Sequence, residues 1–511
     1  MISCKENAMQ TKRVMRTLPA LMISLSISLS FAVSNSQAQS IIGALADDGP
    51  TETIELTVSP AASPSPAFKY RLTVLPHQTI SGNAASTYMR SLAEGGLRSP
   101  LKRISDKFGL ESHSWYDSQQ FKDVAPEKIL EASAEFDDYV REYLARATMQ
   151  RDCDFDLGME DLQGERAIGF SLSFEQETRS MSRVLGLQTR AAIIEGRFAD
   201  AVALMRMNYQ LAQNVAQTPA LVAGLIGIAE VGITNHGMEQ LIAAEGSPNM
   251  YWALTELPRP IIDLRRAMRL EMQWGERLIP ELAEAQQEHT DQEWNSLLNK
   301  ISGRFADGML FAQVQNGPSG VAERKPVPQD AMMATALGLA SYRSAKKRLI
   351  AGGETKDNVE AMSVSEVLMK DAARELTRIS DFAEKEIYLP YPQSANRLDR
   401  VEDFLIGEEK RNSPGAIFAS MILPAAIQVR RAQLRVDRNI CALRAIEALR
   451  MHVAETGVLP SSLDEINIVP VPDNPATGKP FRYRLKDGAA VLDLPRDGLN
   501  LYWKRYVIRL R

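Results

Sequence analysis

Apolar residues recur at helical spacing from residue 83 to about residue 410, and this pattern restricts the chain to a mainly helical fold. Asn83 is a good N-cap residue and predicts that the first helix starts there. Pro126 predicts the first turn of a long helix over 126–149. We therefore expect residues 81–412 to form a helical bundle or a short solenoid.

The same spacing predicts further helices, and composition indicates where some of them lie. Residues 219–232 are apolar nearly all round, which predicts a central buried helix, and the stretch is too short and too interrupted to span a membrane. The composition of 316–329 predicts a linker within the helical body. The other expected helices cover 165–196, 198–217, 260–287, 330–353 and 361–391.

The stretch "EGRFADA" (195–201) resembles the turn of a tetratricopeptide unit, in which two helices pack closely. Gly196, Phe198 and Ala201 carry the resemblance. No second copy lies about 34 residues away, the repeat length of that family. We expect one such helical hairpin and no peptide-binding superhelix.

The first 38 residues have the composition of a secretory signal peptide. An apolar stretch over 18–33 follows a basic start, and small residues precede a cleavage point after Ala38. The alternative is an uncleaved anchor, but this run of 16 residues is shorter than the roughly 20 that a spanning helix needs. We expect export to the periplasm or the extracellular space, with no transmembrane span after cleavage.

Residues 39–80 lack helical spacing and predict an extended segment. "TIELTV" (53–58) and "FKYRLTVLP" (68–76) both alternate in the manner of strands, around a proline-rich spacer. We expect this β-like extension to pack on the main body or to pair with itself.

Charge and cysteine content restrict the partners and the chemistry. The formal net charge is −5, and it becomes −8 without residues 1–38. This acidic balance argues against nucleic acid and favours a protein partner in the cell envelope. After cleavage Cys153 and Cys441 remain, and in an oxidising compartment they either pair or stay free.

The last hundred residues combine one helix with a hairpin. The spacing over 436–457 predicts a long amphipathic helix that ends at Gly457. A single helical turn over 461–466 and a proline-rich loop over 470–480 follow it. "FRYRL" and "AVLDL" alternate around Asp487-Gly488, which is a strong signal for a tight β-hairpin.

The order of "GVLPSSL" (457–463), "NPATGKPFRYR" (474–484) and the hairpin resembles the globular part of type II secretion major pseudopilins. The resemblance implies a small α+β domain, which we assign to residues 413–511. The sequence departs from that family in two respects. No pilin processing site precedes the apolar stretch over 415–426, which contains Pro424, and the signal peptide at the start of the chain is of the Sec type. The pilin route of assembly is therefore excluded.

Across most of its length the chain resembles a family of large exported proteins from planctomycete-type bacteria. The matching stretches include "RAAIIEGRFADA" (190–201), "ELPRPIIDLRRAM" (256–268) and "LRAIEALRMHVAETGVLPSSLDEI" (443–466). The resemblance implies no particular activity, so it transfers no functional residue.

Candidate catalytic and metal-binding residues are few. Ser344 and Lys347 have the spacing of a penicillin-binding S-x-x-K motif, but no K-T-G motif follows. His236 and Glu239 lie one helical turn apart but lack the third ligand of a zinc site. "ESHSWYD" (111–117) is an aromatic loop that suits either a binding lip or ordinary packing.

Residues 152–161 contain aspartates at the spacing of a calcium loop, at positions 152, 154 and 156. Leu157 occupies the place of the required glycine and Gln163 that of the bidentate glutamate, so a helix N-terminus is the favoured interpretation. We assign no catalytic, cofactor-binding or metal-binding residue and expect no cofactor. The sequence favours a non-enzymatic exported scaffold or protein-interaction protein. The alternatives are a component or client of an envelope secretion apparatus, and a hydrolase whose site is not visible as a motif.

Overall fold

The computed structural model describes residues 52–94, 96–108, 124–158, 175–306, 328–394, 414–495 and 503–511. Over these ranges the chain is mainly helical with a four-stranded sheet and a two-stranded sheet, which confirms the expected fold class at this level. The signal peptide expected at 1–38 and residues 316–327 of the expected linker lie outside the described residues.

The chain divides into two compact units, each made of segments that are not continuous in sequence. One boundary between the units lies inside one long helix, at residues 428 and 429. The domains expected at 81–412 and 413–511 stay predictions. The first unit contains Met268–Gln428, and the second combines Asp47–Leu157, Ser171–Ala267 and Val429–Arg511.

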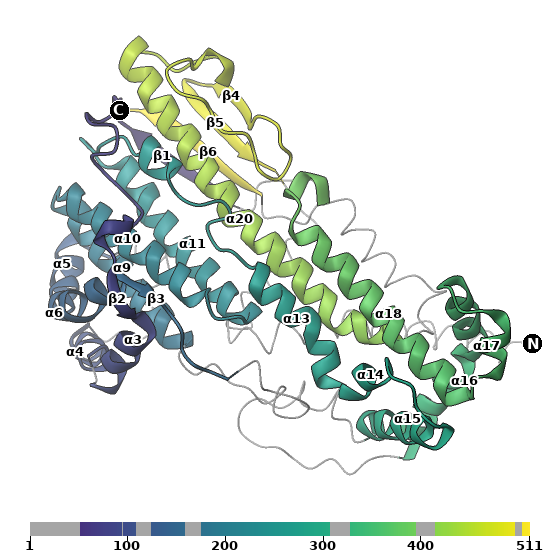
Figure 1. Ribbon diagram of the computed structural model, residues 1–511. Coiled ribbons are helices and arrows are strands. Elements are labelled where there is room, and N and C mark those ends of the chain that lie inside the picture. The colour runs from purple at the N-terminus through teal and green to yellow at the C-terminus, as the bar shows by residue number, and fades with distance from the viewer. Residues whose placement is uncertain are drawn as a thin grey trace, which may run out of the picture. The chain divides into compact units, whose positions relative to one another are not determined.

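Three helices of the second unit pack against one another: α9 (Glu175–Ile194), α10 (Phe198–Val215) and α11 (Leu221–Ala243) (Figure 1). Helix α11 is buried along most of its length, which confirms the expected central helix. Among the described helices it is the one long and apolar enough to cross a membrane, but 67% of its apolar window is buried inside the protein.

Helices α10 and α11 are in close backbone contact at Gly227. A Cβ atom at this position would lie 2.6 Å from the carbonyl oxygen of Ala212, closer than real Cβ contacts. A Cβ atom added at Gly232, on the same helix, would have no atom within 4 Å. Glycine is therefore required at position 227 by backbone packing, whereas position 232 accepts a side chain.

The four-stranded sheet joins both ends of the described chain. Its order is β1 (Glu52–Val58), β6 (Lys504–Leu510), β5 (Ala489–Leu494) and β4 (Arg482–Lys486). Strand β1 runs parallel to β6, and the other neighbours are antiparallel. The expected strand at 53–58 is confirmed as part of β1, but it pairs with the last strand and not within the extension. Alternation in β1 directs Leu56 and Val58 inward, where both are buried.

The expected hairpin is confirmed. Strands β4 and β5 pair in register, with Lys486 opposite Ala489, and a two-residue turn joins them. Asp487 and Gly488 both have positive φ, 52° and 71°, as this turn requires.

The expected strand over 68–76 is wrong, because a side chain from another part of the chain takes its backbone donors. The Glu256 carboxylate accepts from the backbone N–H of Leu72 at 2.8 Å and of Thr73 at 3.3 Å. Arg71 forms an ion pair with the same carboxylate at 2.7 Å. These contacts hold the segment in bends and turns, without a strand ladder.

Helix α20 (Pro414–Thr456) is much longer than the expected helix over 436–457. Pro424 does not interrupt it. The part in the second unit is largely buried and lies along the sheet (Figure 1). A 3-10 turn, η8 (Leu463–Glu465), confirms the expected turn after it.

The helix expected over 126–149 is broken into short pieces. Gln188 of α9 donates to the backbone carbonyl of Ser133 at 2.7 Å and to Asp137 at 2.9 Å, and so satisfies the groups exposed at the first break.

The expected N-cap is confirmed, because Asn83 accepts from the N–H of Ala85. The remaining elements of the second unit are η2 (Pro76–Gln78), β2 (Ile80–Asn83), α3 (Ala84–Ala93), α4 (Arg98–Phe108), α5 (Pro126–Ala134), α6 (Asp137–Tyr139), the π-helix η5 (Val140–Leu144), α7 (Ala145–Ala147), β3 (Gln150–Asp152), which pairs with β2, and α12 (Tyr251–Thr255).

The first unit is helical in its described part. Ser363 accepts from the N–H of Glu366 and starts a helix of 24 residues, which we expected to begin at 361. A core cluster joins Ala345, Leu349, Val359, Met362, Val367 and Leu368. The helices are α13 (Arg265–Leu278), α14 (Pro280–Glu284), α15 (Asp291–Ala306), α16 (Pro328–Ala351), α17 (Lys356–Ala361) and α18 (Val364–Ile387).

Candidate functional site

Among the described residues, many of the buried polar side chains lie on α20. The side chains of Arg450 and Glu447 are both 0% exposed and form an ion pair at 2.9 Å. Arg450 also donates to the carbonyl oxygens of Ser247 and Ser59, each at 2.9 Å. Burial raises the pKa of the Glu447 carboxyl, and Arg450 offsets part of that rise. This pair therefore fastens α20 to two segments that are distant in sequence.

Other polar side chains of α20 also bind segments that are distant in sequence. Gln433 donates to the carbonyl oxygen of Ile262 at 2.5 Å, and Asp437 accepts from the N–H of Ile261 at 3.0 Å. Burial raises the pKa of Asp437 to about 6. Arg438 donates to the carbonyl oxygen of Pro495 at 2.7 Å, and Arg444 donates to the Thr255 hydroxyl at 3.0 Å. These groups each bind a partner in another segment of the second unit.

A second buried cluster surrounds Glu239 of α11. Its carboxylate accepts from Lys504 at 2.7 Å and from the Tyr506 hydroxyl at 2.7 Å, and it lies 3.2 Å from Nδ1 of His236. Burial alone would raise the pKa of Glu239, but His236, Lys504 and Tyr506 together hold it below the ordinary value. The sequence placed His236 and Glu239 together, and the structure adds a cation and a hydroxyl in place of further metal ligands.

Glu230 is a buried carboxyl and one of the residues that interrupt the apolar stretch over 219–232. It lies on α11 and is fully buried. Burial raises its pKa to about 8, and Thr178 and Arg179 offset part of the effect. An acidic residue in a helix that is apolar nearly all round is the signal that predicts such a site.

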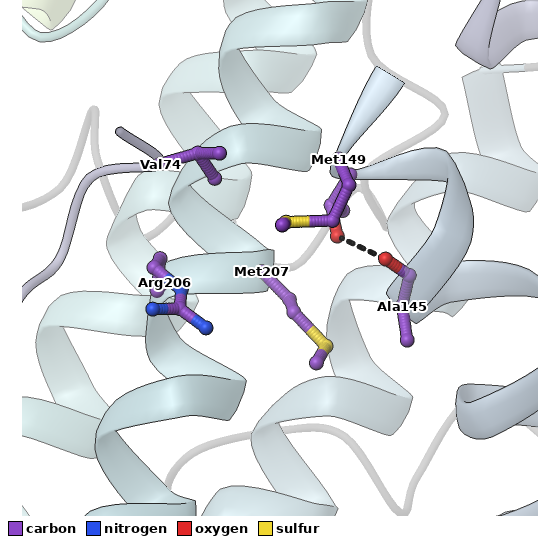
Figure 2. Close-up of a pocket in the computed structure, with 6 residues that line it drawn as sticks. Val74, Ala145, Met149, Arg206 and Met207 are labelled. Atoms are coloured by element: carbon purple, nitrogen blue, oxygen red, sulfur yellow. Dashed lines mark hydrogen bonds between the residues drawn. The ribbon is translucent and has the colours of Figure 1, made fainter. Parts of the chain in front are cut away.

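One cavity of about 210 Å³ lies between the 72–75 segment, α7 and α10 (Figure 2). Arg206 is the one titratable group among the residues that line it. The Thr148 hydroxyl donates to the carbonyl oxygen of Leu144 at 2.8 Å. The lining is otherwise apolar and comprises Val74, Ala145, Thr148, Met149, Arg206 and Met207. These residues hold no pair of groups for acid–base or nucleophilic chemistry.

The aspartates of 152–161 do not form a calcium loop within the described residues. Asp152 ends β3, and Asp154 accepts from the N–H of Asp156 at 2.9 Å. The expected helix N-terminus is wrong for 153–158, which contain no helix, and residues 159–161 lie outside the described part. Where the structure describes the chain, no three His, Cys, Asp or Glu residues are placed to hold a metal ion.

The other candidates are not brought together either. Ser344 donates to the carbonyl oxygen of Ser341 in its own helix, at 2.7 Å. Cys153 and Cys441 are free and buried, and burial raises their thiol pKa values to about 12 and about 11. The loop at 111–117 lies outside the described residues.

The outer face of the four-stranded sheet carries a concentration of charge that sequence reasoning missed. Strand alternation and register place five basic and two acidic residues on this face, which we call the basic sheet face. Asp493 accepts from Arg484 at 2.7 Å and from Arg505 at 2.6 Å, and Glu55 accepts from Arg509 at 3.0 Å. The basic sheet face comprises Arg482, Arg484, Lys486, Arg505 and Arg509, with Glu55 and Asp493.

Comparison of the chain with protein-family models, with curated proteins and with solved structures finds no match. The functional argument therefore depends on the geometry of this chain.

Proposed function

We propose that the protein is a non-enzymatic extracytoplasmic scaffold that binds another protein of the cell envelope. The observation that carries the proposal is the contrast between its interior and one of its surfaces. The buried ionisable groups of α20 bind backbone groups of neighbouring segments, as Arg450 does with Ser59 and Ser247. The sheet, in contrast, leaves an edge strand, β4, largely exposed beside the basic sheet face.

The composition of residues 1–38 supports an extracytoplasmic location. A rigid interior suits a scaffold, because buried ion pairs with several hydrogen bonds have few alternative arrangements. Binding by an exposed edge strand is a common mode of protein recognition.

Two finer features of the fold belong to this proposal. We propose that α9 and α10 form a tetratricopeptide-like hairpin, supported by Gly196 at φ 72° between the helices and by the fully buried Ala201. We propose that the end of the chain is pseudopilin-like, supported by its order of long helix, 3-10 turn, proline-rich loop and hairpin. The parallel strand β1 is an addition to that pattern.

The order of elements at the end of the chain also favours a second candidate function, that of a component or client of an envelope secretion apparatus. In that case the partner is a protein of the apparatus. A truncation at residue 413 is a poor test, because it removes α20 and with it the bonds that hold the second unit together. Substitutions on the basic sheet face are a better test, because these side chains lie largely at the surface.

The experiment is crosslinking in native envelopes with the full chain, followed by identification of the attached proteins and their stoichiometry. We expect one defined partner with wild-type protein and its loss in the double variant Arg482→Glu/Lys486→Glu. The matched control is Arg90→Glu/Arg141→Glu, an exposed double reversal outside the sheet. Absence of any stoichiometric partner overturns the proposal. Turnover of a peptide or glycan by the purified chain supports the hydrolase alternative.

A further inference from the structure

We infer that the free edge of β4 binds an extended acidic segment of the partner, which adds to the sheet as a fifth strand. This inference rests on the proposed scaffold function and specifies the chemistry of the partner. It depends on two independent observations, the backbone geometry of the edge and the charge of the face beside it.

The backbone groups of β4 point alternately toward β5 and away from the sheet. Lys486 lies opposite Ala489 across the two-residue turn, so Lys486, Arg484 and Arg482 exchange hydrogen bonds with β5. The N–H and C=O groups of Tyr483 and Leu485 therefore point outward. Within the described chain no backbone or side-chain partner binds these groups. Leu485 is 45% exposed, so the edge is open to solvent at this position.

The charge of this edge selects an acidic partner. Strand β4 contains three basic residues and no acidic one, and all three lie on the basic sheet face. Lys486 forms no ion pair with any residue that the structure describes, and Arg484 shares Asp493 with Arg505. The face therefore has more positive than negative charge on a chain whose formal net charge is −5. Glutamates on alternate positions of an added strand would lie beside these cations.

The same features disfavour other occupants. A second copy of β4 would place arginine and lysine opposite like charges, which destabilises strand pairing. Single-stranded nucleic acid binds to basic surfaces that also provide aromatic side chains for base stacking. The outer positions of the four described strands contain no aromatic residue, and Trp503, directly before β6, already has the Arg505 guanidinium 5.7 Å from its ring centroid. A single ring in this position does not form a stacking platform for successive bases. The Tyr483 hydroxyl donates to the carbonyl oxygen of Pro460 at 2.7 Å.

The test measures binding of fluorescein-labelled peptides to the purified full chain by fluorescence anisotropy. The probe is acetyl-(Val-Glu)₄-amide. One control probe, acetyl-(Pro-Glu)₄-amide, has the same charge, but proline fixes φ at about −65° and removes every second N–H, so this peptide favours a polyproline II chain over a strand. A second control, acetyl-(Val-Lys)₄-amide, reverses the charge. We expect the Val-Glu peptide to bind at least 10-fold more tightly than either control, with an affinity that falls as salt rises.

Two variants separate the edge from the charge. Leu485→Pro removes the outward N–H without removing a bond to β5, and Leu485→Ala keeps that N–H. We expect Leu485→Pro to weaken binding of the Val-Glu peptide at least 10-fold and Leu485→Ala to change it less than 3-fold. We expect Arg482→Glu/Lys486→Glu to weaken it at least 10-fold with unchanged circular dichroism. In the wild type, the peptide should slow hydrogen exchange at the amides of Tyr483 and Leu485 at least 10-fold.

Equal binding of the Val-Glu and Pro-Glu peptides overturns the inference, because attraction would then not require a strand. Tighter binding of an oligothymidine or of phosphatidylglycerol vesicles than of the Val-Glu peptide also overturns it. If Leu485→Pro fails to fold, the double charge reversal and the exchange measurement decide the result. A stoichiometric envelope partner together with an inert edge removes this inference and leaves the scaffold proposal standing. Peptide binding at the edge without any envelope partner removes the scaffold proposal and leaves strand addition at β4 standing.

Discussion

Lys504 in the last strand donates to Glu239 in the central helix α11 over 2.7 Å, and the two residues are 265 positions apart. Their side chains are 10% and 4% exposed, so the ion pair is largely screened from water. Tyr506 reinforces it through a second bond to the same carboxylate, at 2.7 Å. The pair fixes the four-stranded sheet to the helical layer of the second unit.

We expect Lys504→Met to lower the free energy of unfolding by about 3 kcal/mol, because it leaves the Glu239 carboxylate buried without its cation. The measurement is urea denaturation at pH 7. Arg509→Met is the matched control, since Arg509 and Glu55 form a surface pair at 3.0 Å with side chains 52% and 68% exposed. It should change stability by less than about 1 kcal/mol. Equal effects of the two variants would show that Glu239 is accessible to water.

We expect an isolated fragment of residues 413–511 to remain unfolded. In the whole chain Arg450 and Glu447 of this fragment are buried against Ser59 and Ser247, which the fragment lacks. It also lacks β1, the parallel neighbour of β6. Circular dichroism and limited proteolysis check the outcome. A protease-resistant, cooperatively unfolding fragment would contradict the division into two units described above.

We expect Gly227→Ala to lower the free energy of unfolding by about 1–3 kcal/mol, because the new Cβ would lie 2.6 Å from the backbone oxygen of Ala212. Gly232→Ala is the control on the same helix, where no atom lies within 4 Å of the added Cβ. It should be neutral or stabilise the protein by up to about 1 kcal/mol, because alanine favours the helix. The prediction fails if thermal denaturation gives both variants the same sign.

We expect the stability of the wild type to fall as the pH rises from about 5 to about 8. The pKa of Glu230 is raised by burial from 4.5 to about 8, so the folded chain holds this proton more tightly than the unfolded chain does. Its contribution is complete below the unfolded pKa and is lost as the pH rises through the folded pKa.

The variant Glu230→Gln has no such proton, so its free energy of unfolding should fall less than that of the wild type over this range. At pH 8 we expect the two falls to differ by roughly 3–5 kcal/mol. Denaturant titrations at pH 5, 6, 7 and 8 provide the comparison. Glu245→Gln, at a side chain 78% exposed, should follow the wild type. Parallel curves for Glu230→Gln and the wild type would exclude this carboxyl as the source of the pH dependence.

Features that depend on neighbouring residues were predictable from the sequence. The hairpin at Asp487-Gly488 follows from a turn that needs two positive φ values, and the Asn83 cap follows from a side chain that bonds two residues ahead. The burial of α11 follows from its composition, because a helix without a polar face has to lie inside the fold. These features depend on local backbone geometry or on the polarity of one segment, and a short stretch of sequence determines both.

The candidate site was much less predictable. The basic sheet face brings Glu55 beside Arg509, 454 positions later, and no periodicity in either strand indicates this pairing. The expected strand over 68–76 failed because Glu256, from another helix region, takes the backbone donors of Leu72 and Thr73. In both cases the decisive partner is remote in sequence.

The sequence by itself determined the helical class, the hairpin and the positions of several helix ends, because those depend on the preferences of adjacent residues. The tertiary structure alone decided that the first and last described strands share a sheet, and that α20 is the centre of a unit. It also decided which ion pairs are buried. The physical reason is that hydrogen-bond partners and desolvation depend on which segments come into contact in the folded chain. When two such segments lie hundreds of residues apart, the sequence of one does not identify the other.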